Sequence, residues 1–153
     1  MRYELKVVPT PNLTYTSAYL SGLMDSDGSI YYNLDSGQVF ISVCQKSRFI
    51  IDKLVPVYGG KVYVYEGSKF SAAKWVVWRK DDVLSLVINY FKENPCQSAK
   101  IKRIHAVETY HRLRRLGAHK ETMSSVIGKR WNRFIKKWES YELVWKRDGP
   151  PFH

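Results

Sequence analysis

The feature that most constrains this chain is the stretch AYLSGLMDSDGSIYY, residues 18–32, where an apolar segment runs directly into acidic residues. Large apolar side chains are separated there only by alanine, serine and glycine, a pattern that predicts a helix buried on nearly every side. Asp25 and Asp27 follow, and Gly28 supplies a stop before strand-like residues. The fold must therefore bury this helix beside a sheet and leave carboxylates where the helix ends.

Two small residues, Gly22 and Ser26, are spaced i and i+4 on the predicted helix and therefore share one face. Such a stripe permits the close approach of a second helix, which in a two-fold dimer can be the same helix of another copy. An ordinary central helix without a partner is the alternative interpretation.

The acids fall at a helix end, where unpaired carbonyl oxygens carry the negative end of the helix dipole. Asp27 adds a carboxylate at this point. Oxygen ligands with concentrated negative charge suit a hard divalent cation such as Mg²⁺. A polar turn without any metal is the alternative for these acids.

The chain before and after this stretch is organised as hairpins alternating with helices. Thr14 or Thr16 can cap the first helix, which ends near Asp27. The segments predicted next are strands over 29–35 and 38–45, a helix over 48–55, strands over 61–67 and 71–79, and helices over 82–94 and 98–116. This α-β-β-α-β-β-α order predicts an α/β chain of the α+β kind, with one four-stranded antiparallel sheet and helices on a single face.

The amino-acid composition limits the kinds of partner that the chain is expected to bind. The formal net charge is +11 with 44% hydrophobic residues, so the chain is globular and suited to a polyanion. The apolar runs are too short to span a bilayer, and the N-terminus lacks a signal-peptide core. Cys44 and Cys96 make neither a disulfide framework nor a metal cluster. We expect free thiols, an intracellular protein in the cytoplasm, nucleoid or an organelle, and no membrane partner.

The nine residues LSGLMDSDG, from Leu20 to Gly28, closely resemble the LAGLIDADG motif of homing endonucleases. The predicted element order is also similar to that family, and the resemblance covers roughly residues 15–118. It divides the chain into an N-terminal arm (1–14), an endonuclease core (15–118) and a basic helical C-terminal extension (119–153), with one or two helices from Glu121. The resemblance implies a saddle-shaped sheet that sits on the major groove of DNA.

The function implied by this resemblance is that of a site-specific homing endonuclease, which makes a double-strand break in a long pseudo-palindromic DNA target. The acid at the eighth motif position, Asp27, would hold the catalytic metal beside Ser26, and Asp25 would be structural. Mg²⁺ is the expected metal, with Mn²⁺ able to substitute and Ca²⁺ supporting binding without cleavage. A single motif implies a homodimer whose interface contains Leu20, Gly22, Leu23 and Ser26.

Two further catalytic positions are implied by the family. Gln45, at the end of the second predicted strand, would organise water beside the metal. A lysine is expected just before the last core helix, but Pro95 stands near its place. Lys92 and Lys100 are the available substitutes, and we favour Lys92 because it precedes the turn.

A two-stranded ribbon fits the major groove of DNA. Successive strand residues point to opposite faces of the sheet, so alternation along each strand predicts which side chains would face DNA. A slip of one residue, above all in the second hairpin, would exchange the two faces. The DNA-binding set comprises Tyr31, Asn33, Asp35, Gln38, Phe40, Ser42, Lys46, Lys61, Tyr63, Tyr65, Lys69, Lys74 and Val76, with Arg133 and Lys137 from the basic extension. Two rival functions use the same fold: an RNA maturase that assists intron splicing, and a non-catalytic DNA-binding regulator.

Overall fold

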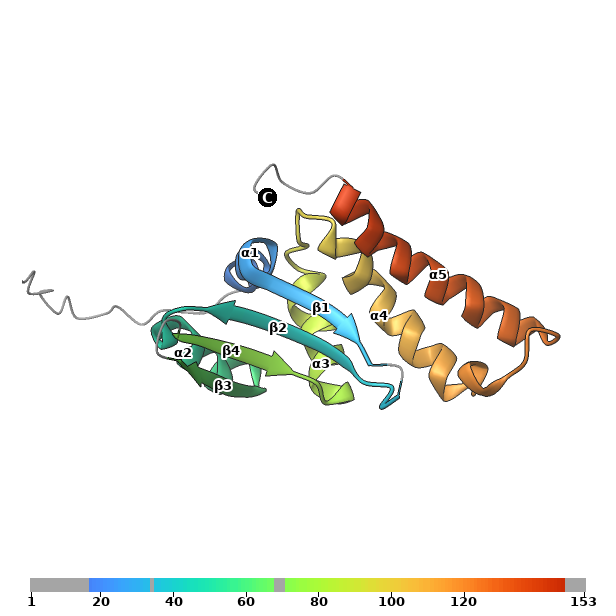
Figure 1. Cartoon of the computed structure of the whole chain (residues 1–153), viewed down its shortest axis with the longest axis horizontal. Helices are drawn as coiled ribbons and strands as arrows, with labels where there is room; N and C mark the ends of the chain where they lie inside the picture. Colours follow the sequence, from blue (N-terminus) through green and yellow to red (C-terminus); the bar gives the residue numbers. More distant parts are fainter. Residues whose placement is uncertain (1–16, 34, 68–70, 148–153) are drawn as a thin grey trace, which may run out of the picture.

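The computed structural model describes residues 17–33, 35–67 and 71–147, with side chains described as far as residue 141. Its strands form one antiparallel sheet in the order β1-β2-β4-β3 (Figure 1). The strands are β1 (Gly28–Tyr32), β2 (Val39–Gln45), β3 (Lys61–Glu66) and β4 (Ser71–Val77). Each hairpin supplies one central and one edge strand, and β2 pairs with β4 in the middle. The predicted α+β fold with a four-stranded antiparallel sheet is confirmed.

Helices precede and follow each hairpin, and α2 and α3 lie behind the sheet as Figure 1 is drawn. The helices are α1 (Ser17–Asp27), α2 (Arg48–Tyr58), α3 (Lys80–Leu86), the π-helical turn η1 (Val87–Phe91), α4 (Lys100–Arg115), the short η2 (Ala118–Lys120) and α5 (Val126–Arg147). The single helix expected over 82–94 is therefore α3 continued by η1. Among the described residues, none of the helices has the length and apolar character needed to cross a lipid bilayer.

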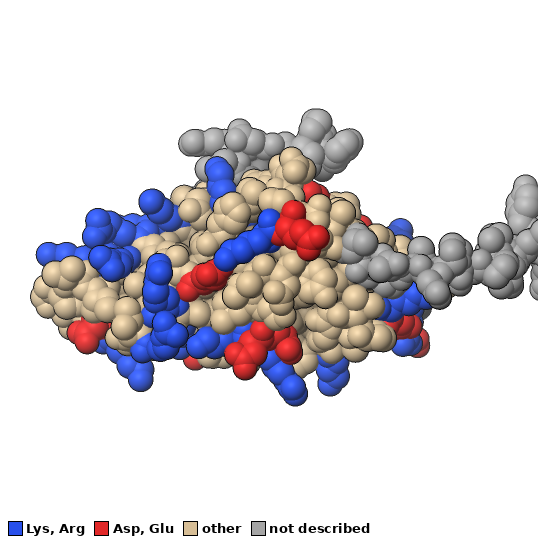
Figure 2. Space-filling view, turned by 180° about the vertical axis from the view of Figure 1, so that it is seen from behind, with Lys and Arg blue, Asp and Glu red and all other residues tan. Residues whose placement is uncertain are grey.

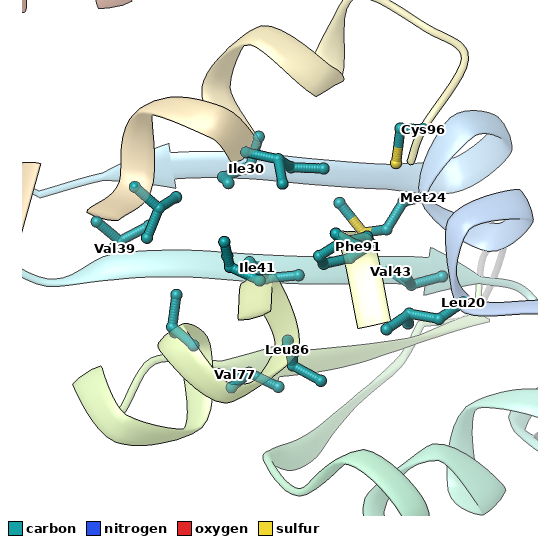
Figure 3. Close-up of a cluster of buried hydrophobic side chains, with 14 of the residues drawn as sticks. Leu20, Met24, Ile30, Val39, Ile41, Val43, Val77, Leu86, Phe91 and Cys96 are labelled. Carbon is teal, nitrogen blue, oxygen red and sulfur yellow. The ribbon is translucent and has the colours of Figure 1, made fainter. Parts of the chain in front are cut away.

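The core lies between the sheet and these helices (Figure 3). Val39, Ile41 and Val43 alternate along β2 with at most 1% of their surface exposed, because successive strand residues point to opposite faces. Leu86 and Phe91 reach this layer from α3 and η1. The inward phase expected for the central strand β2 is thus the observed one.

Helix α1 has one buried face and one exposed face. Leu20 and Met24 are fully buried in the core of a single chain. Gly22 and Ser26 lie on the exposed side, and a Cβ built on Gly22 would meet nothing within 4 Å. The assignment of Leu20 to a dimer interface is therefore wrong, because 100° per residue places it opposite Gly22 and Ser26. Leu23, 8% exposed, is also largely committed to the core.

The first hairpin is shorter than expected. β1 ends at Tyr32, and Asn33 closes the turn: its Oδ1 accepts hydrogen bonds from the backbone N–H groups of Asp35 (2.9 Å) and Ser36 (3.3 Å). Gly37 takes a left-handed φ of 72° and donates to the Asn33 carbonyl. Asn33 and Asp35 therefore belong to a side-chain-capped turn and not to the strand face, as such residues favour.

The C-terminal extension forms the single long helix α5, which packs on α4 (Figure 1). Trp131, Phe134 and Trp138 share one face of α5 and surround Tyr110 of α4 at ring-centroid distances of 5.6 to 6.1 Å. The Arg103 guanidinium of α4 donates to the Ile30 carbonyl of β1 (2.8 Å) and lies over the Trp138 ring. The extension is thus attached to both the last core helix and an edge strand.

Candidate active site and nucleic-acid face

The carboxylate of Asp27 stands at the C-terminal end of α1, where the chain turns into β1. Gln45 is the last residue of β2, and its side-chain amide donates a hydrogen bond of 2.8 Å to Asp27 Oδ2. The Ser26 hydroxyl lies 3.4 Å from the same oxygen and also bonds the Leu23 carbonyl. Two residues predicted for the catalytic site, distant in sequence, are therefore brought together by the pairing of β1 with β2.

Lys100, the first residue of α4, completes the polar end of α1. Its Nζ donates to the Met24 carbonyl (2.6 Å) and the Asp25 carbonyl (3.2 Å), which helix geometry leaves without intrahelical partners. Burial lowers the pKa of Lys100, although the negative charges of Asp25 and Asp27 oppose this shift. The ammonium is thus half-buried beside the acids and not dispersed in solvent.

Asp25 has a different environment from Asp27. Its carboxylate accepts hydrogen bonds from the backbone N–H groups of Gln97 and Ser98, both at 2.9 Å. Burial alone would raise the pKa of Asp25, but hydrogen bonds from Ser98 and Gln97 and the charge of Lys100 outweigh it and lower the pKa. Asp25 therefore ties α1 to the loop that precedes α4.

A hollow of about 360 Å³ opens beside Asp27 and Lys100. Arg103 and Tyr141 form part of its wall, together with residues at the start of β1. Tyr141 comes from α5, and no sequence signal indicated its place here because it lies far outside the motif. The extension therefore contributes directly to the surroundings of the acid.

Lys92, favoured as the catalytic lysine, is placed elsewhere. Its Nζ pairs with Glu108 Oε1 of α4 at 3.0 Å, and it does not line the hollow beside Asp27. Both side chains of this pair are largely exposed. The geometry favours Lys100, the other substitute, because its Nζ bonds carbonyls at the end of α1 and it lines the hollow beside Asp27.

The oxygen donors near Asp27 suit a metal site that water and phosphate oxygens complete. Within the described residues, no group of three or more His, Cys, Asp and Glu side chains could hold a metal ion. One carboxylate from this chain suits Mg²⁺, which usually keeps several waters and takes one or two carboxylates together with phosphate oxygens. A complete all-protein cage, as in a structural zinc site, does not fit these residues.

The sheet face opposite the helices is concave and aromatic. A hollow of about 450 Å³ is lined there by Tyr31, Gln38, Phe40, Tyr63, Tyr65, Lys74, Val76 and Trp78. Tyr31 and Phe40 stack across β1 and β2 with centroids 5.1 Å apart, and Lys74 Nζ lies 5.4 Å from the Tyr31 ring. Seven of these eight side chains belong to the predicted DNA-binding set, so the expected strand phase holds in both hairpins.

Other members of the predicted set are placed less favourably. Ser42 is 2% exposed and Val76 is 5% exposed, so their neighbours largely cover them. Lys46 and Lys61 are exposed, at the end of β2 and the start of β3. Lys69 lies outside the described residues.

Arg133 and Lys137 are exposed on α5, whereas Trp131 and Trp138 of the same helix are buried. This separation of charged from aromatic positions leaves both cations accessible to a large partner.

An apolar helix here ends in an exposed carboxylate beside a concave sheet, in a chain with a formal net charge of +11. The family model described as LAGLIDADG endonuclease matches residues 20–111, more than half of the chain. The chain therefore belongs to the LAGLIDADG endonuclease family. Endonucleases of this family are generally metal-dependent.

Two curated relatives show the functions found among similar proteins. The chain is 27% identical over 143 residues to the intron-encoded DNA endonuclease ai2b of Dictyostelium discoideum, covering 88% of this chain and 53% of that protein. It is 29% identical over 133 residues to the intron-encoded RNA maturase bI4 of Saccharomyces cerevisiae, covering 84% and 20%. The chain thus spans about half the length of the first relative and a fifth of the second.

Solved structures support the fold. The LAGLIDADG homing endonuclease I-GzeII, in complex with its DNA target, superposes with a TM-score of 0.64 at 16% identity, covering 86% of this chain and 46% of that one. The homing endonuclease I-TnaI superposes with a TM-score of 0.54 at 15% identity, covering 80% and 97%. At these identities the likeness concerns the fold alone.

Proposed function

We propose that this chain is a site-specific homing endonuclease that makes a double-strand break in a long pseudo-palindromic DNA target by metal-dependent phosphodiester hydrolysis. The observation that carries the proposal is Asp27, an exposed carboxylate at the end of the motif helix, oriented by Gln45 at 2.8 Å and facing a hollow shared with Lys100. Family membership supports the same activity.

Asp27 holds Mg²⁺ in this proposal, with the Ser26 backbone as a neighbouring oxygen donor. The bound ion would lower the pKa of a water and neutralise charge on the phosphate. Gln45 contributes by fixing one carboxylate oxygen, Oδ2, so that the other can face the ion. Mn²⁺ is expected to substitute for Mg²⁺, and Ca²⁺ to support DNA binding without cleavage.

Lys100 is the residue that we assign beside the reacting phosphate. The two α1 carbonyls hold its ammonium in place. The ammonium of a lysine in this position can steady a phosphate oxygen or polarise a water. Lys92 has no part in the proposed chemistry.

A second copy of the chain is expected to cover the exposed face of α1. Gly22 and Ser26 leave that face open to a close approach, and Tyr19 beside them is 36% exposed. Two-fold pairing of α1 helices would place two Asp27 carboxylates on either side of the axis, one for each DNA strand. This pairing requires a near-palindromic target, with half-sites related by the same axis.

The test is incubation with a library of near-palindromic duplexes, with and without Mg²⁺, followed by sequencing of the cut ends. We expect Mg²⁺-dependent double-strand cleavage at one family of sequences. Asp27→Asn is the control: cleavage should fall at least about 100-fold while binding in Ca²⁺ persists, because the change removes a metal ligand but keeps the shape of the side chain. Cleavage by Asp27→Asn at the wild-type rate would refute the proposal.

An RNA maturase is the second candidate, favoured by the similarity to the yeast maturase over 84% of this chain. The maturase and endonuclease functions are distinguished by measuring the splicing of a group of structured intron RNAs with and without the protein. Stimulation of splicing that survives Asp27→Asn, with no DNA cleavage by the wild type, would favour the maturase. A non-catalytic DNA-binding regulator would bind one duplex sequence tightly and cut none.

A further inference from the structure

A second hollow in the molecule, of about 350 Å³, lies at the other end of the sheet from Asp27. It is bounded by the turn between β1 and β2, the end of β4, the start of α3 and the end of α4. Figure 1 shows that turn beside the C-terminal end of α4, whereas α1 adjoins the opposite end of β1. The charged and imidazole side chains that line the hollow are Lys80, His111, Arg114, Arg115 and His119.

The charge in this hollow is of one sign. No carboxylate lines it, and no Asp or Glu of the described residues forms an ion pair with Lys80, Arg114 or Arg115. Figure 2 shows Lys and Arg side chains gathered toward the end of the molecule formed by α4 and α5. Cations that converge without an acid raise the local potential and favour an anion.

Each of the two imidazoles in the hollow has one ring nitrogen with no hydrogen-bond partner among the described residues. His111 is 8% exposed, and its buried Nε2 has no hydrogen-bond partner among the described residues; the same holds for His119 Nδ1. Buried polar atoms are ordinarily hydrogen-bonded. Burial and then the charges of Lys80 and Arg114 lower the pKa of His111 to about 4, so near neutral pH it is a neutral imidazole that can donate to an anion's oxygen.

The Arg114 guanidinium lies against the Gly37 backbone in the hairpin turn. A Cβ added to Gly37 would lie 2.3 Å from the Arg114 guanidinium carbon, so the missing side chain makes room for this cation. The Tyr110 hydroxyl donates to the Gly37 carbonyl at 3.2 Å and holds the same turn against α4. The hollow is therefore built by packing between two elements and not by mobile side chains alone.

From this arrangement we infer that the hollow binds a backbone phosphate of the DNA target, as a second anchor away from the cleavage site. Gln38 and Trp78 line both this hollow and the concave sheet face, so the two surfaces are continuous. The inference rests on the proposed function, because DNA must lie on the sheet for its backbone to reach the hollow. The interaction adds affinity and sets the register of the duplex without reading its sequence.

The geometry gives the position of the bound phosphate. Gln45 adjoins Asp27, and Gln38 adjoins the hollow. At about 3.3 Å per residue, the extended run between them spans about 23 Å. Each strand of B-DNA advances about 3.4 Å per phosphate, so with β2 lying along the duplex axis the anchored phosphate would be about seven base pairs from the cut.

The test uses Lys80→Gln and Arg115→Gln, exposed positions for which the structure shows no ion pair, with Lys53→Gln on α2 as the charge-matched control. Affinity for the cleaved duplex in Ca²⁺ is measured between 50 and 200 mM salt. Removing one phosphate interaction should reduce the log–log salt slope by about 0.9, so the wild type should lose about 3.5 times more affinity over this range than either hollow variant. Lys53→Gln should keep the wild-type slope.

A methylphosphonate scan locates the phosphate. Neutralising the phosphate about seven base pairs from the cut should weaken wild-type binding. The same change should have no additional effect on Arg115→Gln, because a shared interaction makes the two losses non-additive. Full additivity at every phosphate, or unchanged salt slopes for both hollow variants, would overturn the inference while leaving the proposed endonuclease intact. A wild type that neither binds nor cuts any duplex would instead overturn the proposed function, and this inference with it.

Inorganic phosphate separates a DNA anchor from a site for a small anion. We expect inorganic phosphate to compete with DNA at the hollow only weakly. Binding of phosphate is measured from the His111 and His119 imidazole resonances in an NMR titration. Saturation of these resonances by phosphate with no change in DNA affinity would identify a small-anion site and contradict the DNA anchor.

Discussion

At the residue scale, the two acids that follow the apolar helix have separate roles although one residue lies between them. Asp25 accepts two backbone N–H groups and closes α1 against the loop before α4, whereas Asp27 faces a hollow and is oriented by Gln45. A helix turns 100° per residue, so neighbours two apart point in nearly opposite directions. The same rotation that buries Leu20 therefore gives the Asp25 and Asp27 carboxylates different surroundings.

The choice between Lys100 and Lys92 can be tested by matched substitutions. Lys100→Met should reduce cleavage at least about 100-fold while Ca²⁺-supported binding remains, because it removes the only lysine among the described residues that lines the hollow beside Asp27. Lys92→Met should cut at close to the wild-type rate and lose at most about 1 kcal/mol of stability, since it breaks an exposed ion pair. Single-turnover cleavage of the selected duplex measures both, and equal losses for the two variants would contradict the assignment.

A pH dependence of stability should follow from His111, whose pKa burial and the charges of Lys80 and Arg114 lower from 6.5 to about 4. Between these values the unfolded chain binds a proton that the folded chain does not, so stability falls as the pH falls through this window. One such group contributes a loss of about 2 kcal/mol between pH 7.5 and pH 5.

Chemical denaturation of His111→Gln and wild type at both pH values measures this contribution. The variant should lose about 2 kcal/mol less than the wild type on acidification, whatever its stability at pH 7.5. A parallel pH dependence for the two proteins would show that His111 becomes protonated in the folded chain.

At the element scale, α1 serves two surfaces. Its buried face packs on the sheet through Leu20 and Met24, and its exposed face presents Gly22 and Ser26. A single chain gives the exposed face no covering group at Gly22. The packing of one copy therefore does not require a small residue at Gly22, which is consistent with the proposed contact between two α1 helices.

Gly22→Leu should separate assembly from folding. A Cβ at Gly22 meets no described atom within 4 Å, and leucine favours a helix by up to about 1 kcal/mol over glycine, so the fold should persist. Two α1 helices could no longer approach closely, so sedimentation should show monomers where the wild type forms dimers. Leu20→Ala is the contrasting control and should cost about 2–5 kcal/mol of stability, because it leaves a cavity in the core. A Gly22→Leu dimer of wild-type affinity would place the interface elsewhere.

Helices and strands can be predicted from the sequence where a single hydrophobic period runs through a segment. Alternation places Val39, Ile41 and Val43 inward without reference to any partner. The end of β1 is harder to predict because the Asn33 side chain replaces strand bonds with a turn, and a strand pattern does not reveal this competition. The place of Lys100, and that of Tyr141 from α5, depends on packing between distant segments, which local sequence does not encode.

At the scale of the whole molecule, the basic charge is distributed over more than one surface. Lys74 lines the concave sheet face and Lys61 lies over the Tyr63 ring of that face. Lys100 stands at the Asp27 end, and Arg114 and Arg115 of α4 lie at the other end. The helix α5 adds Arg133 and Lys137 beyond the sheet. In the proposed complex with DNA, long-range attraction by this charge would speed encounter and add affinity for any sequence.

Reversing Arg133 and Lys137 together to glutamate tests whether α5 reaches the DNA backbone. Both side chains are exposed and lie away from the aromatic face that packs on α4, so the fold should be retained. If they bind phosphates, affinity for every duplex should weaken, and the log–log salt slope should become shallower by about 0.9 for each phosphate that is no longer bound. The exchange Arg133→Lys with Lys137→Arg keeps both charges and should preserve the slope. Fluorescence anisotropy across a salt series measures these slopes, and an unchanged slope in the reversed variant would limit α5 to supporting α4 and the wall around Asp27.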